Sequence, residues 1–276
     1  MPNYIEEQLP FPNVKRADFV SSTIVKYIPE KLHEEYRILD IGCGTGELFS
    51  IPLAVRLKKF KNIKISGIDI DDPSIERAKK HIDNLSLNNL KFEYKSIKEI
   101  NDTYSCVCLM AVLEHLADPD NMLIEIRKRL KPGGIFILYI PNGYGAYEVE
   151  SFLIKKFREL GLVSIFKPTY TFLRKVKRRL FKESSKKDRN AFIIKETLND
   201  PNNVHIQFFK LKEIKKKLIN YGFLINNIFK TRFLGGPISS FFILRFKFLE
   251  KFDHKVASII PAAIASDWTF ISTYMK

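Results

Sequence analysis

The residues best suited to chemistry lie in one short stretch, ILDIGCGTGELF, which runs from Ile38 to Phe49. An apolar run at its start is typical of the end of a buried strand. The chain then passes through Gly42, Gly44 and Gly46 into residues that can begin a helix. Glycine lets the backbone turn sharply and approach a ligand without an intervening Cβ atom. This order predicts a nucleotide-type site at the carboxyl end of a parallel strand.

The spacing of the glycines excludes two common nucleotide sites. The dinucleotide fingerprint G-x-G-x-x-G fails because the sixth position from Gly42 is Glu47. The phosphate-binding pattern G-x-x-x-x-G-K-[ST] is absent from the chain. An ordinary glycine-rich turn is the remaining structural alternative. The whole run LDIGCGTG, however, resembles motif I of the class I S-adenosylmethionine-dependent methyltransferases.

An acid follows the second predicted strand. Residues 63–70 (IKISGIDI) have the pattern of a buried strand, and Asp69 lies near its end. An acid at this place, roughly 20 residues after a glycine loop, is suited to accept hydrogen bonds from both ribose hydroxyls. The resemblance implies this role for Asp69 and implies that Ile70 lies against the adenine. Asp71 and Asp72 favour a helix start, so we expect them to cap a helix.

The other cofactor contacts rest on the resemblance alone. Members of the family often carry an acid after the third strand, here 91–94, that accepts a hydrogen bond from the adenine amino group. Lys95 and Ser96 stand there instead, so the Ser96 hydroxyl or a backbone carbonyl is the expected substitute. The residues that the resemblance assigns to the cofactor are Asp40, Gly42, Cys43, Gly44, Gly46, Asp69, Ile70, Ser96, Ile97 and Met110.

Two histidines are candidates for a general base. Methyl transfer is an in-line displacement, and holding donor and acceptor about 3 Å apart can lower the barrier by roughly 7–11 kcal/mol. A base adds about 10²–10⁴-fold when a hydroxyl must lose its proton. Histidine titrates near neutral pH, and both His115, after the fourth strand, and His205, before a C-terminal helix, are suitably placed. A purely structural role is the alternative for each.

We expect no metal at the site. Some O-methyltransferases similar to this chain bind a divalent metal through E-x-x-E-H. Glu114 and His115 match the last two positions of that pattern, but Ala111 replaces the first acid. Glu114, His115 and His205 could form only a poor site.

The class of acceptor is narrowed by motifs that are absent. Residues 110–113 read MAVL, so the N/D-P-P-Y/F run that accompanies methylation of exocyclic amines on bases is missing after the fourth strand. The chain has no Pro-Cys pair, which base C5 chemistry needs. Residues 141–145 (PNGYG) resemble methyltransferases found with glycan biosynthesis. We therefore expect O-methylation of a small hydrophobic, glycan or lipid-linked acceptor, with S-adenosylhomocysteine as the other product.

A parallel sheet must bring these residues together. Strand patterns occur at 37–41, 63–70, 91–94, 105–110 and 135–140, with helices predicted between them. The runs LEHL at 113–116 and KPGG at 131–134 resemble the second half of the methyltransferase core. The resemblance covers about residues 36–142. It implies an α/β fold, a Rossmann-like seven-stranded mostly parallel sheet with helices on both faces.

The predicted organisation is a single domain over residues 1–276. Its parts are a cofactor-binding core at 14–142, a basic helical insert or cap at 143–204, and C-terminal strands at 205–276 with a helical insertion at 238–260. Helix Leu211–Asn220 and a last strand at Asp267–Tyr274 are predicted within the C-terminal part.

Composition agrees with a globular protein of the cytoplasm. Hydrophobic residues make up 45% of the 276 residues, and the net charge is +15. The N-terminus has no apolar signal region, and the best apolar run, 238–249, contains charges that make it unfit to span a bilayer. Cys106 and Cys108 are two apart in a strand pattern, so we expect them to share a buried face in a reducing compartment.

Residues 151–190 form the most basic part of the chain, with 13 Lys or Arg against three acids. Apolar residues recur there at helical spacing. Three interpretations remain open: a helix on the inner face of a membrane, a nucleic-acid clamp, and a cap whose charges are merely solvated. The corresponding alternatives for the whole chain are an RNA methyltransferase and a non-catalytic S-adenosylmethionine-binding protein. The oligomeric state is not predicted.

Overall fold

A single seven-stranded sheet organises the protein. The computed structural model describes residues 9, 11–28, 34–83, 85, 87–160, 205–236, 239 and 247–275. The strand order is β3-β2-β1-β4-β5-β7-β6. Neighbours from β3 to β5 pair in parallel, whereas β7 is antiparallel to both β5 and β6. The strands are β1 (Tyr36–Ile41), β2 (Ile63–Asp69), β3 (Leu90–Tyr94), β4 (Tyr104–Met110), β5 (Leu130–Pro141), β6 (Phe223–Phe229) and β7 (Asp267–Tyr274).

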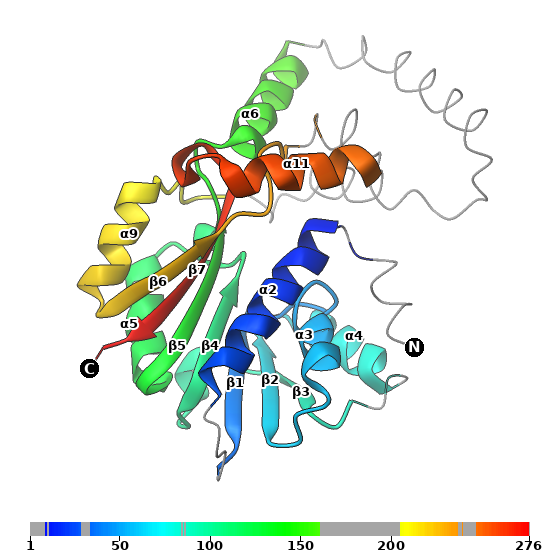
Figure 1. The fold of residues 1–276 in the computed structure, drawn as a ribbon, viewed down its shortest axis with the longest axis vertical. Coiled ribbons are helices and arrows are strands. Elements are labelled where there is room, and N and C mark those ends of the chain that lie inside the picture. Colours follow the sequence, from blue (N-terminus) through cyan, green and yellow to red (C-terminus); the bar gives the residue numbers. More distant parts are fainter. Residues whose placement is uncertain are drawn as a thin grey trace, which may run out of the picture.

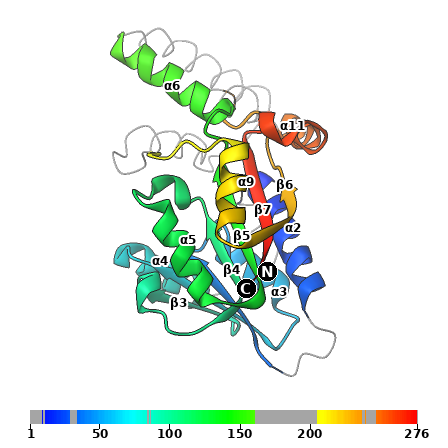
Figure 2. The ribbon, with the colours of Figure 1, turned by 90° about the vertical axis from the view of Figure 1, so that its left-hand side faces the viewer.

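Helices cover both faces of this sheet, as the sequence predicts. Apolar residues of α2, α3 and α4 join one buried cluster, and those of α5 and α9 join the other. Figure 2 shows α2 and α5 on opposite sides of the sheet. The described helices are α2 (Phe11–Tyr27), α3 (Ser50–Leu57), α4 (Asp72–Asp83), α5 (Pro119–Arg129), α6 (Ala146–Glu159), α9 (Leu211–Asn220) and α11 (Lys247–Ile259), with short 3₁₀ turns η1 (Ile97–Glu99), η2 (Leu113–His115) and η3 (Ala262–Ile264).

The central strands are buried on both faces. In β4, Cys106 and Cys108 face one cluster while Val107 and Leu109 face the other, because side chains alternate along a strand. Both cysteine side chains are fully buried, with 3.9 Å between their sulfurs. The prediction that they share a buried face is confirmed.

Most predicted elements are present, with shifts at their ends. The bounds of α9 and β7 agree with the sequence prediction. The helix predicted after the glycine loop, α3, begins at Ser50, because residues up to Phe49 still form turns. Among the described residues, no helix has the length and apolar character needed to cross a bilayer.

The predicted insert is described only in part. Helix α6 confirms helical structure at its start, and α11 occupies the second half of the insertion predicted at 238–260. Residues 161–204, which hold most of the basic run, lie outside the described residues. Figure 1 shows α6 and α11 beyond the carboxyl edge of the parallel strands, where the loops that follow β1, β2, β4 and β5 meet.

Candidate cofactor and acceptor site

The loop after β1 needs glycine for two reasons. Gly42 and Gly46 have φ angles of +68° and +71°, in the left-handed region that favours glycine. A Cβ atom on Gly42 would lie 2.4 Å from Cγ2 of Val112, and one on Gly46 would lie 2.3 Å from Cζ of Phe92. The loop therefore packs directly on the segment after β4 and on β3, which leaves no room for a side chain at either position.

Asp69 links this loop to the end of β2. Its Oδ2 accepts a hydrogen bond from the Gly44 amide at 2.7 Å, and its Oδ1 accepts one from the Asp71 amide at 3.0 Å. Each carboxylate oxygen retains a further lone pair. A Cβ atom on Gly44 would meet no atom within 4 Å, so open space lies beside the loop. The residues present therefore fit an adenosyl ligand whose hydroxyls reach Asp69.

Ile70 has the exposure that an adenine platform needs. Its side chain is 74% exposed, although isoleucine is among the residue types most often buried. Asp71 accepts a hydrogen bond from the Ser74 amide at 3.2 Å, which is the helix-capping contact that the sequence predicts for it.

Asp40 lies beneath the glycine loop. Its side chain is 1% exposed and accepts a hydrogen bond from the Ser50 hydroxyl, while its Oδ1 has no partner among the described residues. Burial raises the pKa of Asp40 to about 7, against the effect of the Ser50 hydrogen bond.

Cys43 and Met110, also assigned to the cofactor, are partly buried. Burial raises the pKa of the Cys43 thiol, which keeps it neutral.

Ser96 and Ile97 lie at the start of the turn η1. The Ser96 hydroxyl accepts a hydrogen bond from the Lys98 amide, and the Ser96 amide donates to Glu99, so this residue caps the turn η1. The Ile97 side chain is buried. Both assignments to the adenine stay predictions.

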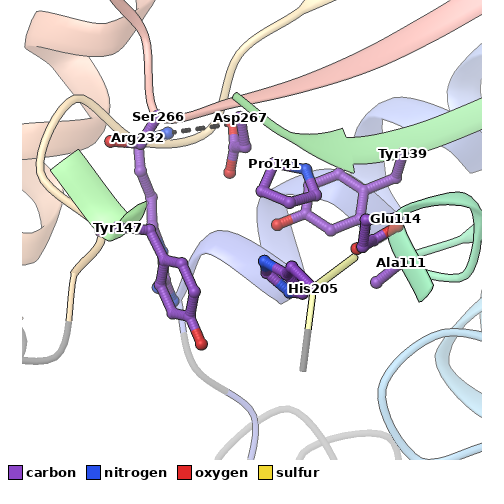
Figure 3. A pocket seen from close by; sticks show the side chains of 10 residues that line it. Ala111, Glu114, Tyr139, Pro141, Tyr147, His205, Arg232, Ser266 and Asp267 are labelled. Carbon is purple, nitrogen blue, oxygen red and sulfur yellow. Dashed lines mark hydrogen bonds between the residues drawn. The ribbon is translucent and has the colours of Figure 1, made fainter. Parts of the chain in front are cut away.

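A cavity of about 160 Å³ lies at the carboxyl edge of β4 and β5. One of its lining residues, Ala111, directly precedes Val112, whose side chain packs on Gly42 of the glycine loop. Figure 3 shows Glu114 and His205 close together, with Arg232 and Asp267 further along the cavity. The lining residues are Ala111, Glu114, Tyr139, Pro141, Tyr147, His205, Arg232, Gly235, Ser266 and Asp267.

Of the two predicted bases, His205 lines this cavity, whereas His115 lies behind it against the ring of His205. The rings of His115 and His205 are 4.9 Å apart between centroids and meet edge to face. Ligand atoms of Glu114, His115 and His205 all lie within 4.8 Å of one another. Side chains this close together could hold an ion. The expectation that no metal binds here therefore stays a prediction.

Glu114 is a buried acid that faces the two histidines. Its side chain is 1% exposed, and its Oε2 has no hydrogen-bond partner among the described residues. Burial raises its pKa to about 7, so that near neutral pH the carboxyl is partly protonated. Its backbone carbonyl accepts hydrogen bonds from the amides of Ile206 and Gln207, both at 3.0 Å. These bonds hold the 205–209 segment against η2.

His205 is paired with an acid from α6. Its Nδ1 lies 2.5 Å from Oε1 of Glu148, and both side chains are 13% exposed. Burial disfavours the charged ring. The hydrogen bond and charge of Glu148, with the charge of Glu114, outweigh burial and raise the pKa of His205.

A buried cation, Arg16, lies behind two lining residues of the cavity, Tyr139 and Asp267. The guanidinium of Arg16, from α2, lies 3.3 Å from the ring centroid of Tyr139 and 3.6 Å from Oδ2 of Asp267. Asp267 also accepts hydrogen bonds from the amide and the hydroxyl of Thr231. The pKa of Tyr139 is raised to about 12 by burial. This network fixes β5 and β7 relative to α2.

Of the ten residues that line this cavity, the sequence predicted only His205 as a catalytic or cofactor-binding residue. Tyr139, Tyr147, Arg232 and Asp267 were not predicted as site residues. The one available signal was topological: a last strand that runs antiparallel begins at the edge where the parallel strands end, so its first residue, Asp267, must lie near the site.

Comparisons with known proteins agree with this geometry. A family model described as a methyltransferase domain matches residues 32–191, more than half of the chain. The ubiquinone biosynthesis O-methyltransferase of Maricaulis maris is 31% identical over 134 residues, which are 45% of this chain and 49% of that protein. The trans-aconitate 2-methyltransferase of Deinococcus radiodurans is 28% identical over 117 residues, 42% of each chain. The chain thus matches about half the length of these curated relatives.

Solved structures show the same fold. Magnesium protoporphyrin IX methyltransferase from Synechocystis PCC 6803, solved with bound S-adenosylhomocysteine, superposes with a TM-score of 0.50 at 15% identity and covers 95% of this chain and 84% of that one. The predicted family and fold are therefore confirmed. The chain belongs to the methyltransferase domain family, and its cofactor is S-adenosylmethionine.

Proposed function

We propose that this protein transfers the methyl group of S-adenosylmethionine to an oxygen atom of a small hydroxylated acceptor. The observation that carries the proposal is the cavity at the carboxyl edge of β4 and β5. It is lined by groups that can hydrogen-bond, and one lining residue, Ala111, directly precedes the residue that packs on the glycine loop. The similarity to a ubiquinone biosynthesis O-methyltransferase supports the choice of oxygen.

The size of the cavity limits what it can enclose. Drug-sized ligands occupy pockets of roughly 300–1,000 Å³, whereas a cavity of about 150 Å³ is enough for benzene. A volume of about 160 Å³ therefore suits a single six-membered ring, such as a phenol or a sugar, with the rest of the acceptor outside. Tyr139, Tyr147 and Arg232 supply polar groups along its walls.

His205 is the proposed base. The acceptor oxygen forms a bond to the methyl carbon as the carbon–sulfur bond breaks, and the acceptor proton passes to Nε2 of His205. The sulfur keeps the electron pair, so S-adenosylhomocysteine leaves as a neutral thioether. Bound S-adenosylmethionine supplies the reactive methyl group, and the chain supplies orientation and the proton acceptor. His115 lies against the ring of His205 and helps to orient it.

Label transfer tests this function. The purified chain is incubated with methyl-labelled S-adenosylmethionine and separate lipid, RNA and soluble small-molecule fractions of a cell extract. We expect label in the lipid or small-molecule fraction as a methyl ether that resists mild alkali. His205→Asn abolishes most of the transfer, while His81→Asn, on an exposed part of α4, leaves it intact.

The other results would each replace the proposal. Label in RNA would favour the RNA methyltransferase interpretation of the basic run. Label released by mild alkali as methanol would identify a carboxylate acceptor rather than a hydroxyl. No label in any fraction, with normal cofactor binding, would favour a non-catalytic S-adenosylmethionine-binding protein.

We also propose that the acceptor is reached at an anionic lipid surface. Helices α6 and α11 lie beyond the carboxyl edge of the parallel strands (Figure 1) and carry exposed apolar side chains beside exposed lysines. Each lysine near such a surface contributes about 1 kcal/mol. The residues are Val149, Phe152, Leu153, Lys155 and Lys156 on α6, and Lys251, Phe252, Lys255 and Ile259 on α11.

Liposome flotation tests the lipid surface. The wild-type chain should float with vesicles that contain anionic lipid and not with neutral ones. The double variant Phe152→Ser, Phe252→Ser should lose most of this binding. The matched control is Ile219→Ser, Leu224→Ser, two exposed apolar residues on α9 and β6. Equal flotation of both double variants would contradict the proposal.

A further inference from the structure

The base candidate His205 and the acid Glu148 lie at opposite ends of one chain segment. Glu148 is in the first turn of α6, and His205 is the first described residue after position 160. Their side chains meet, with 2.5 Å between Oε1 of Glu148 and Nδ1 of His205. Residues 57 apart in sequence are thus joined beside the cavity.

This contact decides which ring nitrogen can accept a proton. A neutral imidazole carries hydrogen on one nitrogen and a lone pair on the other. A carboxylate only accepts hydrogen bonds, so the nitrogen that it contacts must be the donor. The hydrogen is therefore assigned to Nδ1 from its partner, and Nε2 keeps the lone pair.

Two rings restrict the orientation of His205. The His115 ring contacts it edge to face at 4.9 Å, and the Tyr147 ring lies at 5.4 Å with a tilt of 35°. Tyr147 immediately precedes Glu148, so the first turn of α6 contributes both a ring and an acid to the same histidine. With Nδ1 held by Glu148, the opposite side of the ring is left for the cavity that His205 lines.

We propose that Glu148 is a positioning residue that fixes the tautomer and the orientation of His205, so that Nε2 receives the acceptor proton. This inference rests on the proposed function for the role of that proton. When Nε2 takes the proton, the ring becomes an imidazolium, and its Nδ1–H remains bonded to the Glu148 carboxylate. The new positive charge is thereby paired with a carboxylate in a site largely closed to water.

Other charged groups around the ring do not replace Glu148. Glu114 faces the ring from η2, and its carboxyl is partly protonated near neutral pH. Arg16 lies over the ring of Tyr139, a lining residue of the cavity. Among the described residues, Glu148 is the carboxylate that lies within hydrogen-bond distance of a His205 nitrogen. Loss of its charge should therefore change the histidine in a way that loss of a distant acid does not.

The test uses the full chain and a matched control. Glu148→Gln keeps the size of the side chain but can offer its amide as a donor. Glu159→Gln changes an exposed acid at the end of the same helix, which pairs with Lys156. Ring nitrogens of His205 are followed by ¹⁵N NMR in the presence of a chelator, with His205→Asn used to assign the signals.

We expect His205 in the wild-type chain and in Glu159→Gln to carry hydrogen on Nδ1 when neutral. In Glu148→Gln it should shift to the Nε2–H tautomer or a mixture, and the pKa of the ring should fall. An unchanged tautomer and pKa in Glu148→Gln would overturn the proposal. If Glu148→Asp, which keeps the carboxylate, retains the Nδ1–H tautomer, the result would support a specific contact between a carboxylate at position 148 and His205.

Methyl transfer supplies a second readout. In the fraction that the wild-type chain labels, Glu148→Gln should lower the rate at saturating cofactor by at least about tenfold, with cofactor affinity unchanged and the pH profile displaced. If the transfer rate of Glu148→Gln is within twofold of the rate of Glu159→Gln, the proposed role of Glu148 in methyl transfer is overturned. A wild-type chain that transfers no label contradicts the proposed function instead, and the NMR result still decides whether Glu148 sets the tautomer.

Discussion

The carboxylate of Asp69 accepts a hydrogen bond from the backbone amide of Gly44, with 2.7 Å between oxygen and nitrogen across 25 residues of sequence. This bond joins the loop after β1 to the end of β2, and it sets the carboxylate before any ligand arrives. Pre-organisation of this kind lowers the entropy that binding must overcome.

Asp69→Ala should weaken binding of S-adenosylmethionine by about 10- to 100-fold, because hydrogen bonds to a charged group contribute about 1.5–3 kcal/mol. Isothermal titration calorimetry measures the dissociation constant. Asp71→Ala is the control, since Asp71 caps α4 and contacts Ser74. Equal affinity of the wild-type chain and Asp69→Ala would remove the assigned role of this acid.

Gly46→Ala should destabilise the fold far more than Gly133→Ala. Both glycines have φ near +70°, so both variants incur a backbone cost of about 1 kcal/mol. Only Gly46 has Phe92 within 2.3 Å of the added Cβ, whereas Gly133 has no atom within 4 Å. Urea denaturation gives both free energies of unfolding. If the two variants lose similar amounts of unfolding free energy, the loop at Gly46 can move away from Phe92.

Asp40→Asn should remove a pH dependence of stability. Aspartate has a pKa near 3.9 when unfolded, and burial raises that of Asp40 to about 7 in the folded chain. The folded chain therefore binds more protons between about pH 4 and 7, and the wild type loses stability as pH rises through this window.

Between pH 5 and 7 the wild type should lose about 2–3 kcal/mol relative to Asp40→Asn. Urea denaturation of both chains at several pH values measures this difference. Taking the difference between the two chains cancels the contribution of Glu114, whose pKa is also raised to about 7. Parallel curves for the two chains would contradict the assignment to Asp40.

Arg16→Met should destabilise the protein by roughly 3 kcal/mol, because it leaves the buried carboxylate of Asp267 without its cation. It also removes the guanidinium that lies over Tyr139. Lys15→Met, in an exposed pair with Asp18, should change stability by less than about 1 kcal/mol. Thermal unfolding of both variants checks the contrast.

Metal removal should leave activity unchanged. Ala111 supplies no ligand where some O-methyltransferases have an acid, so we expect less than stoichiometric zinc or magnesium by elemental analysis and full transfer in a chelator. One tightly held metal ion per chain, with activity lost on chelation, would show that Glu114, His115 and His205 form a metal site.

The contact of the glycine loop with Asp69 was predictable because both parts are local patterns. Glycines at 42, 44 and 46 follow a strand, and an acid ends the next strand, so two short patterns and the rule that parallel strands end at one edge place them together. The bounds of α9 and β7 were likewise readable from short apolar patterns and their stop signals.

The residues around the cavity are brought together by packing between segments that are distant in the sequence. The contact of Glu148 with His205 joins α6 to a segment 57 residues later, and Arg16 reaches Asp267 from the other end of the chain. Short-range patterns of apolar and turn residues specify strands, helices and tight loops. Which polar side chains meet across those loops depends on how the whole sheet and its covering helices pack, and no local pattern encodes that.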